Sequence, residues 1–574
     1  MTEKSKLQYT LLIALCAATG MLLSTLPHIL SSLRIGQPIW IADHDDLLYG
    51  AYSGYAYHHA TWSIQDPVTR DGGVTMYPWM QFMPGILVAR LLNVGSLEVN
   101  LVWRAMAGAS IALAWFLFFA HYFKERLLAT ALAVFMLADI GLAAGKPLFR
   151  HVLVSTLIAT NHPGTLLDQY PQLLPQWRLI TPALSLPFML LYWWLLARAR
   201  EQSTWRRLLL AGASLGLLFY VYFYNWTSAS LALAIAYLVD SGFRRVYVHV
   251  AWIGVLVGAP ALVLAALTKK HTLPDWLLRS DNFVPINRSS ELLIPSASVV
   301  LLFAAGVWAL WKRRDLIYLW AIAVAGLLLE NHQVITGLQV QNFHWVYAWG
   351  PALSALIVLL VSDAVSRFVA TRQHLGSVVV WGGTILLILH VAAAFWLRGV
   401  EATRSRESKE IAEVYGRFRS QRMTGNAVPF SQGLAVAGDH GFLEIAAVAE
   451  SMRPLDHYAV LLSPGVSNQE WDTRIALNAL LSGQRREAFV AGQHSSLRSG
   501  WGIWTRSQAL FEKRLGQRIA AYDSVATRVH QTAVQLGVGY VALPVGVETP
   551  SSLLVDWNIV EDGPYWRIWR RRDV

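Results

Sequence analysis

The chain has 574 residues, of which 55% are hydrophobic and 14% are charged, and its mean hydropathy is +0.39. Soluble globular domains carry about 25% charged residues, so this composition indicates a membrane protein. The net charge of +11 does not indicate nucleic-acid binding, because most Lys and Arg of the apolar part lie in short loops between apolar segments. The single cysteine, Cys16, excludes an intramolecular disulfide and a cysteine metal site.

In chain order, residues 8–30 form the first predicted membrane span. Its apolar stretch is too long for a typical signal peptide and lacks a small-residue cleavage site, so we expect a retained helix with the N-terminus in the cytoplasm. With about eleven spans, the strongly basic short loops all fall on the cytoplasmic side. The later predicted spans are 101–121, 127–144, 182–197, 208–224, 226–240, 247–267, 292–311, 316–332, 346–362 and 377–397.

Four longer connections are predicted on the outer face, at about 34–100, 145–180, 268–291 and 331–345. The first contains "MYPWMQFMPGILVARLL", whose Pro78 and Pro84 favour a helix lying at the membrane interface over a span. The predicted fold class is therefore a multi-pass α-helical membrane protein. Its membrane domain covers residues 1–397.

Residues 398–574 have the composition of a second domain, predicted to be extracytoplasmic and of α/β type. A charged amphipathic helix opens it, and strand-like runs at 433–438, 459–464 and 539–546 alternate with helical pieces such as 440–452 and 529–537. Asp439 precedes a helix and is interpreted as its N-cap, with an anion site as the alternative. No GxGxxG, GxSxG or P-loop motif indicates a soluble catalytic class.

Three carboxylates follow the first span within four positions: Asp43, Asp45 and Asp46. A carboxylate at the centre of a spanning helix costs about 2.5–3.5 kcal/mol, so the group must lie at or beyond the outer membrane boundary. One interpretation is a solvated loop or helix caps. The other is a functional site in an outer cavity.

Polar and aromatic residues of three outer segments are candidates for binding a substrate in such a cavity. The alternatives are an aromatic belt at the interface, solvated cations, and amides that satisfy one another. The candidates are Tyr49, Tyr52, His58 and His59 after the acidic cluster, Lys146, Arg150, His162 and Arg178 in the second loop, and Asn331, His332, Gln341 and His344 in the fourth.

The acidic pair after the first span, the helix pattern "DDLLYGAYSGYA" and the piece "YPWMQFMPGILVARLL" resemble the GT-C class of membrane glycosyltransferases. That class includes lipid A aminoarabinose transferases, protein O-mannosyltransferases and oligosaccharyltransferases. The resemblance covers roughly residues 8–270. The chain has Pro84-Gly85 where many members have Pro-Pro, and it lacks a WWD tripeptide, which argues against peptide N-glycosylation.

The resemblance implies transfer of a hexosyl or pentosyl unit from a polyprenyl-phosphate donor to an envelope glycan, lipid or protein at the outer face of the bacterial cytoplasmic membrane. Asp45 with Asp46 matches the acidic pair of the family, which makes Asp45 the first candidate for the general base and Asp43 the reserve. Arg178, followed by Lys146, Arg150 and Arg288, is expected to meet the charge of the leaving phosphate.

Other roles stay open at this point. Asp43 and Asp45 are alternatively ligands of a divalent ion such as Mg²⁺ or Mn²⁺, because carboxylates suit hard cations. A transporter or flippase that couples to protons is a competing class, but transporters place ionisable groups near mid-membrane, whereas here the charges collect on one side. A non-catalytic scaffold of a polysaccharide assembly complex is the third.

Overall fold

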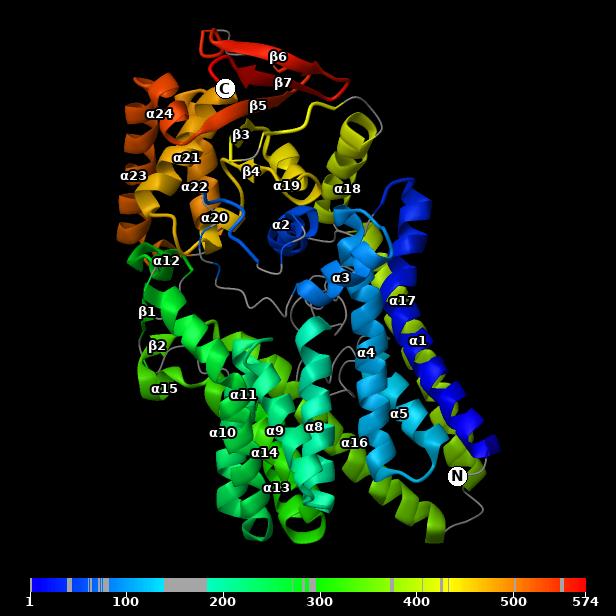
Figure 1. Ribbon diagram of the computed structural model, residues 1–574. Helices are drawn as coiled ribbons and strands as arrows, with labels where there is room; N and C mark the ends of the chain where they lie inside the picture. The colour runs from blue at the N-terminus through cyan, green and yellow to red at the C-terminus, as the bar shows by residue number, and fades with distance from the viewer. Residues whose placement is uncertain are drawn as a thin grey trace.

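The computed structural model describes residues 3–38, 44–59, 61, 64–70, 73, 75, 82–138, 183–270, 272–280, 284–286, 288, 296–371, 376–404, 406–423, 427–431, 433–499, 502–547 and 552–574. Long helices fill the lower part of the molecule in Figure 1, and a sheet with shorter helices lies above them. The helices of the lower part are α1 (Glu3–Ile35), α4 (Val99–Tyr122), α5 (Arg126–Ala138), α8 (Ser185–Glu201), α9 (Trp205–Leu218), α10 (Phe223–Val239), α11 (Arg244–Lys270), α13 (Ser296–Lys312), α14 (Ile317–Glu330), α16 (Val346–Thr371) and α17 (Gly376–Arg404).

Each predicted span overlaps one of these helices, although parts of the predicted spans 127–144, 182–197 and 292–311 lie outside the described residues. Four of the described helical segments are long and apolar enough to cross a membrane: Leu7–Ile35, Ser96–Tyr122, Ser241–Lys270 and Val346–Val369. On α11, Trp252 and Leu256 are exposed to 63% and 56%. Such an apolar exterior suits a lipid surround. The number of spans and the side on which each terminus lies stay predictions.

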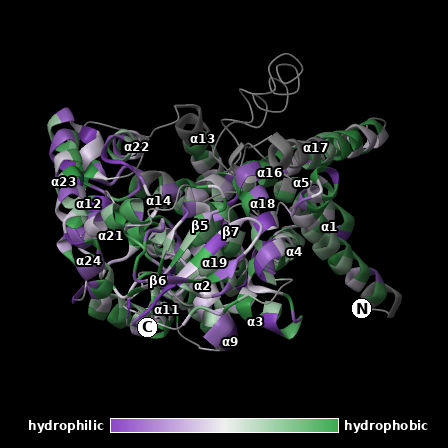
Figure 2. Ribbon diagram, turned by 90° about the horizontal axis from the view of Figure 1, so that it is seen from above, coloured by the Kyte–Doolittle hydropathy of each residue, from purple (hydrophilic) through white to green (hydrophobic). Residues whose placement is uncertain are grey.

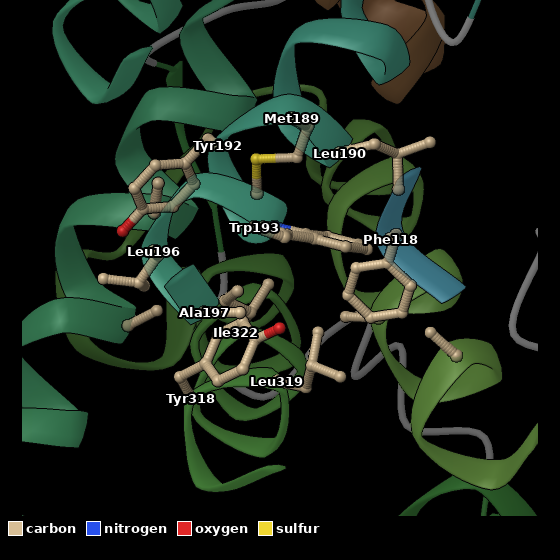
Figure 3. Packing of buried hydrophobic residues seen from close by; sticks show 14 of the residues in the cluster. Phe118, Met189, Leu190, Tyr192, Trp193, Leu196, Ala197, Tyr318, Leu319 and Ile322 are labelled. Carbon is tan, nitrogen blue, oxygen red and sulfur yellow. The ribbon is translucent and has the colours of Figure 1, made fainter. Parts of the chain in front are cut away.

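The core of the helical part is filled by large apolar side chains from sequence-distant helices. Figure 3 shows Met189, Tyr192 and Trp193 of α8 packed near Phe118 of α4 and Tyr318 of α14. Helices α1 and α4 approach closely at Gly20 and Gly108, where a Cβ on either residue would lie about 2 Å from atoms of the facing helix. Small residues at a crossing allow this approach, so α4 is fixed against the first helix.

The first outer loop folds into short helices that lie beside the C-terminal part. These are α2 (His44–His59), α3 (Met83–Leu91) and the 3₁₀ turn η2 (Ser96–Glu98). Helix α3 forms within the predicted interfacial piece, with Pro84 in its first turn, where a missing N–H costs nothing. In Figure 1, α2 and α3 lie close to α18 and α19, so the first outer loop and the C-terminal part occupy the same side of the molecule.

The C-terminal part contains a five-stranded mixed sheet in the order β4-β3-β5-β7-β6. Strands β3, β4 and β5 are parallel, and β7 pairs antiparallel with both β5 and β6. The strands are β3 (Ala435–Gly438), β4 (Arg453–Pro454), β5 (Val538–Pro544), β6 (Trp557–Asp562) and β7 (Trp566–Arg571).

The C-terminal part also contains helices, of which α23 and α24 carry hydrophilic residues at the edge of the molecule (Figure 2). They are α18 (Arg406–Phe418), the π-helical turn η10 (Arg419–Met423), α19 (His440–Ala449), α20 (Ala459–Leu462), α21 (Asn468–Leu481), α22 (Arg486–Ser499), the 3₁₀ turn η11 (Ile503–Arg506), α23 (Gln508–Ala526) and α24 (Val529–Gln535). Asp439 is the N-cap of α19, since its Oδ1 accepts from Phe442 N at 2.9 Å, as predicted.

One strand prediction is wrong: residues 459–464 are not a strand, because α20 forms there. A short apolar run has no period that distinguishes a strand from a helical turn. Here His457 Nδ1 accepts from Ala459 N at 2.9 Å, which turns the chain at the start of the segment. The turn packs against α12 (Pro274–Arg279) from the third outer loop.

Candidate functional site at the first outer loop

Helix α2 begins at His44, which places Asp45 and Asp46 in its first turn. Negative charge there is favoured by the helix dipole. The two carboxylates have different surroundings. Asp46 is 2% exposed and its Oδ2 accepts from Arg104 Nη2 at 2.5 Å, whereas Asp45 is only half-buried. Asp43, the reserve base and metal candidate, lies outside the described residues.

Arg104 belongs to α4, five residues after that helix begins, so the ion pair lies near the end of a membrane helix. Asn100, one turn earlier, donates from Nδ2 to the backbone oxygen of Asp46 at 3.4 Å. The start of α2 is thereby tied to α4, and Asp45 is held at the end of the helix bundle. Arg104 is not among the site residues predicted from the sequence. Its signal was a lone arginine inside the apolar run 101–121, because ionisable residues in such segments usually have a specific partner.

Tyr49 and Tyr52 are core residues rather than a lining of a cavity. Tyr52 is fully buried and Tyr49 nearly so, and their rings lie 6.3 Å from the ring of Phe82. Their aromatic character therefore serves the packing of α2 against the segment that leads into α3. This arrangement does not support a direct substrate contact for either tyrosine.

His58 and His59 line a cavity of about 530 Å³ between the end of α2, the segment 64–70 and the C-terminal part. His58 Nε2 lies 3.1 Å from Ser96 Oγ, and burial lowers the pKa of His58. The ring of His59 stacks on that of Tyr55 at 4.2 Å. The cavity is rich in charged side chains, which include Asp66, Arg70, Glu450 and Arg453.

Asp66 was not among the predicted site residues, yet it is the most deeply buried acid of this cavity. It is 1% exposed; its Oδ2 accepts from Ser463 Oγ at 2.5 Å and its Oδ1 from Val68 N at 3.1 Å. Burial raises the pKa of Asp66 to about 6, against the opposing effect of these hydrogen bonds. No local sequence signal predicts a partner almost 400 residues away.

The acidic start of α2 and the histidines at its end are separated along one helix. Asp45 and His58 are thirteen residues apart, which corresponds to about 20 Å along the axis. The two groups therefore cannot contact the same reacting atom.

The third and fourth outer loops meet through a short antiparallel pair, β1 (Val284–Pro285) with β2 (Leu338–Gln339). Arg506 of the C-terminal part donates to Pro285 O at 3.3 Å and to Gln339 Oε1 at 2.5 Å. Arg288 lies against Gly337, where a Cβ would be 3.4 Å from its Nε. These segments therefore contact the C-terminal part through Arg506.

Most polar candidates of the fourth loop make contacts within the fold. Asn331 donates to Leu327 O at 3.0 Å, and His332 Nδ1 lies 2.8 Å from Leu329 O. His344 Nδ1 lies 2.5 Å from the hydroxyl of Tyr222, and its ring stacks on Tyr224. Gln341 occupies a left-handed turn with φ of 33°. These contacts fit the structural alternative raised for the loop.

The candidates of the second outer loop, Lys146, Arg150, His162 and Arg178, lie outside the described residues, so their roles stay predictions. A metal ion between Asp43 and Asp45 likewise stays a prediction, because Asp43 lies outside the described residues. Over the part of the chain that the structure describes, no group of three or more His, Cys, Asp or Glu side chains is placed to hold a metal ion.

No protein-family model and no curated protein matches this chain. Among solved structures, it is similar to the aminoarabinose transferase ArnT from Cupriavidus metallidurans bound to undecaprenyl phosphate, with 11% identity over 98% of this chain and 97% of that one and a TM-score of 0.44. The apo form of ArnT from Cupriavidus metallidurans gives 13% identity, 99% and 98% coverage and a TM-score of 0.42. Aminoarabinose transferases are one of the groups that the sequence resembles. Because both TM-scores are below 0.5, the likeness identifies no activity or site residue.

Proposed function

We propose that the chain transfers a sugar from a polyprenyl-phosphate donor to an acceptor hydroxyl, at the outer face of the bacterial cytoplasmic membrane, with Asp45 as the general base. The observation that carries the proposal is the pairing at the start of α2. Asp46 is engaged by Arg104 inside the protein, while its half-buried neighbour Asp45 lies beside it on the same turn.

The location of Asp45 suits a donor that resides in the bilayer. Helix α1 ends at Ile35, and α2 begins at His44 a short connection later, so Asp45 lies close to the end of an apolar helix. A polyprenyl chain would lie among the membrane helices with its sugar phosphate at this level. The four apolar segments supply the surface that such a lipid requires.

In the proposed reaction the acceptor hydroxyl attacks the anomeric carbon from the face opposite the phosphate. The new oxygen–carbon bond forms while the bond from that carbon to the phosphate oxygen breaks, with inversion. The Asp45 carboxylate takes the hydroxyl proton, and the polyprenyl phosphate leaves with one additional negative charge. Arg178 is our first candidate to meet that charge, followed by Lys146, Arg150 and Arg288.

The cavity that His58 and His59 line is proposed to hold a part of the acceptor that lies about 20 Å from the reacting hydroxyl. That cavity lies between the first outer loop and the C-terminal part. Its charged side chains offer hydrogen-bond donors and acceptors to a glycan. The N-terminus is proposed to lie in the cytoplasm and the C-terminal part outside.

A deletion strain tests the class of reaction. If the chain is the transferase, the deletion accumulates a polyprenyl-phosphate sugar and lacks one surface sugar, and the wild-type gene reverses both effects. Lipid extracts and surface glycans, analysed by mass spectrometry, give the readout. Deletion of a transporter would also remove the surface sugar, but the lipid-linked sugar would accumulate on the inner leaflet, whereas loss of the transferase leaves it on the outer leaflet.

A further inference from the structure

A second cavity, of about 670 Å³, lies in the C-terminal part between α12, α21, η11 and α23. It shares no lining residue with the cavity at the end of α2. Its volume lies within the range of small-molecule binding sites, roughly 300–1,000 Å³. Nothing in the proposed reaction uses it.

One wall of this cavity is aromatic and apolar. Trp504, which is 4% exposed, lines it together with Ile503 and Leu510, and the ring of Trp471 lies 6.2 Å from that of Trp504. Other side chains of the lining carry amides and hydroxyls, which both donate and accept hydrogen bonds. These are Gln469, Thr473, Gln517 and Ser524. A lining that combines apolar and aromatic groups with such polar groups suits a sugar ring, which has apolar C–H faces and a hydroxyl edge.

The two acidic side chains of the cavity lining, Asp472 and Asp275, both have partners within the protein. The Asp472 carboxylate accepts from Arg514 at 2.5 and 2.6 Å, and Arg518 lies 3.5 Å from it. The Asp275 carboxylate accepts from Asn468 N at 2.7 Å. Both acids of the lining are thus engaged inside the protein.

Cations exceed acids around the same cavity. Lys513 of α23 and Arg528, the residue before α24, line it and are exposed. Burial is the main cause that lowers the pKa of Arg518, next to the cavity, to about 10, and repulsion from the neighbouring Arg514 adds to it. An anion in the cavity would reduce this repulsion.

We propose that the cavity binds a short oligosaccharide that carries a carboxylate. The carboxylate pairs with Lys513 and Arg528 at the mouth, and the sugar ring lies against the wall formed by Trp504. The volume exceeds what a single inorganic anion requires, and the amides and hydroxyls match sugar hydroxyls. The cavity is separate from the proposed reaction site at Asp45. Binding to the cavity can therefore be measured when no sugar transfer takes place.

Calorimetry on the detergent-purified full chain tests the proposal, with trigalacturonic acid as the probe and maltotriose and inorganic phosphate as comparisons. The variant Lys513→Gln with Arg528→Gln removes two exposed cations, and Lys409→Gln with Arg419→Gln removes the same charge from an exposed region elsewhere. We expect binding of trigalacturonic acid to weaken about tenfold or more in the first pair and to stay unchanged in the second.

Ser524→Trp fills the cavity without removing charge, so it should also abolish binding. Maltotriose and phosphate should bind at least about tenfold more weakly than trigalacturonic acid. The proposal is overturned if the probe does not bind the wild type, if phosphate binds equally well, or if either cavity variant retains wild-type affinity. Activity of an Asp45 variant has no bearing on these outcomes.

Discussion

Asp45 and Asp46 are adjacent in sequence and differ in what surrounds them. Asp46 is held by Arg104 at 2.5 Å where neither side chain reaches solvent, and Asp45 is half-buried. Removing one partner of a buried pair leaves an uncompensated charge, which costs about 3–5 kcal/mol. We therefore expect Asp46→Ala to destabilise the chain by this amount in thermal unfolding in detergent. Asp46→Ala with Arg104→Met should recover most of the loss, and equal instability of the single and double variants would contradict the pairing.

Asp66 predicts a pH dependence of stability. Its pKa is raised from 3.8 to about 6 by burial, so the folded chain holds this proton more tightly than the unfolded chain does. Between about pH 4 and pH 6 the unfolded state ionises first, and stability falls as pH rises, by about 3 kcal/mol in all.

Asp66→Asn removes this charge and keeps an oxygen for Ser463 Oγ. The melting temperature of the variant, relative to that of the wild type, should therefore increase as pH rises from 4 to 7. Asp556→Asn, an exposed acid, is the matched control and should follow the wild type. An identical pH profile for Asp66→Asn and wild type would count against a raised pKa.

At the scale of elements, α2 lies against α19 through two glycines. A Cβ on Gly50 would lie 2.9 Å from the Val448 side chain, and a Cβ on Gly54 would lie 2.7 Å from the Val448 backbone oxygen. The backbone cannot move aside as a side chain can. We expect Gly54→Ala to destabilise the chain by about 1–3 kcal/mol.

Gly516 of α23 is the control, because a Cβ there meets nothing within 4 Å. Gly516→Ala should be neutral or stabilise by up to about 1 kcal/mol, since alanine is the better helix former. Gly54→Ala should thus lower the melting temperature, whereas Gly516→Ala should leave it unchanged or raise it. A neutral Gly54→Ala would show that the two helices do not pack so closely.

The helices were predictable from sequence because each long apolar run exceeds the length of an ordinary core segment, and basic loops separate the runs. Strands β3 and β5 were also predictable, since β-prone runs such as "GYVALPVG" are bounded by turn residues. The segment 459–464 was not, because four apolar residues carry no period and a nearby His457 decides the turn.

At the scale of the whole molecule, Arg279 connects the third outer loop to the C-terminal part through hydrogen bonds. Its guanidinium is fully buried and donates to Val466 O at 2.6 Å and to Ser463 O at 2.7 Å. Nearby, Leu273 N donates to Pro464 O at 2.9 Å. Arg279→Ala would leave these carbonyls unsatisfied, at a cost of about 3–5 kcal/mol.

Hydrogen exchange in residues 459–468 should rise in Arg279→Ala, because this segment loses its partner. Arg486→Ala breaks an exposed ion pair with Asp523 and should leave the exchange unchanged. Unaltered protection of 459–468 in Arg279→Ala would mean that the contact does not join the two parts.

Contacts between residues far apart in the sequence explain what the sequence could and could not predict about the site. The position of Asp45 and Asp46 after the first span followed from the insertion cost of carboxylates. The partner of Asp46 lies 58 residues away and that of Asp66 397 residues away. No periodicity or motif encodes such pairs. The burial of Tyr49 and Tyr52 likewise depends on Phe82, which only the fold brings to them.

The most direct test of the proposed mechanism is complementation of a deletion strain by Asp45→Asn, with Asp556→Asn as the matched control. We predict that Asp45→Asn folds with the wild-type melting temperature, leaves the polyprenyl-phosphate sugar accumulated, and restores at most about 1% of the surface sugar, since a base contributes on the order of 10²–10⁴ in rate. Asp556→Asn should restore it fully. Full restoration by Asp45→Asn would contradict its assignment as the general base.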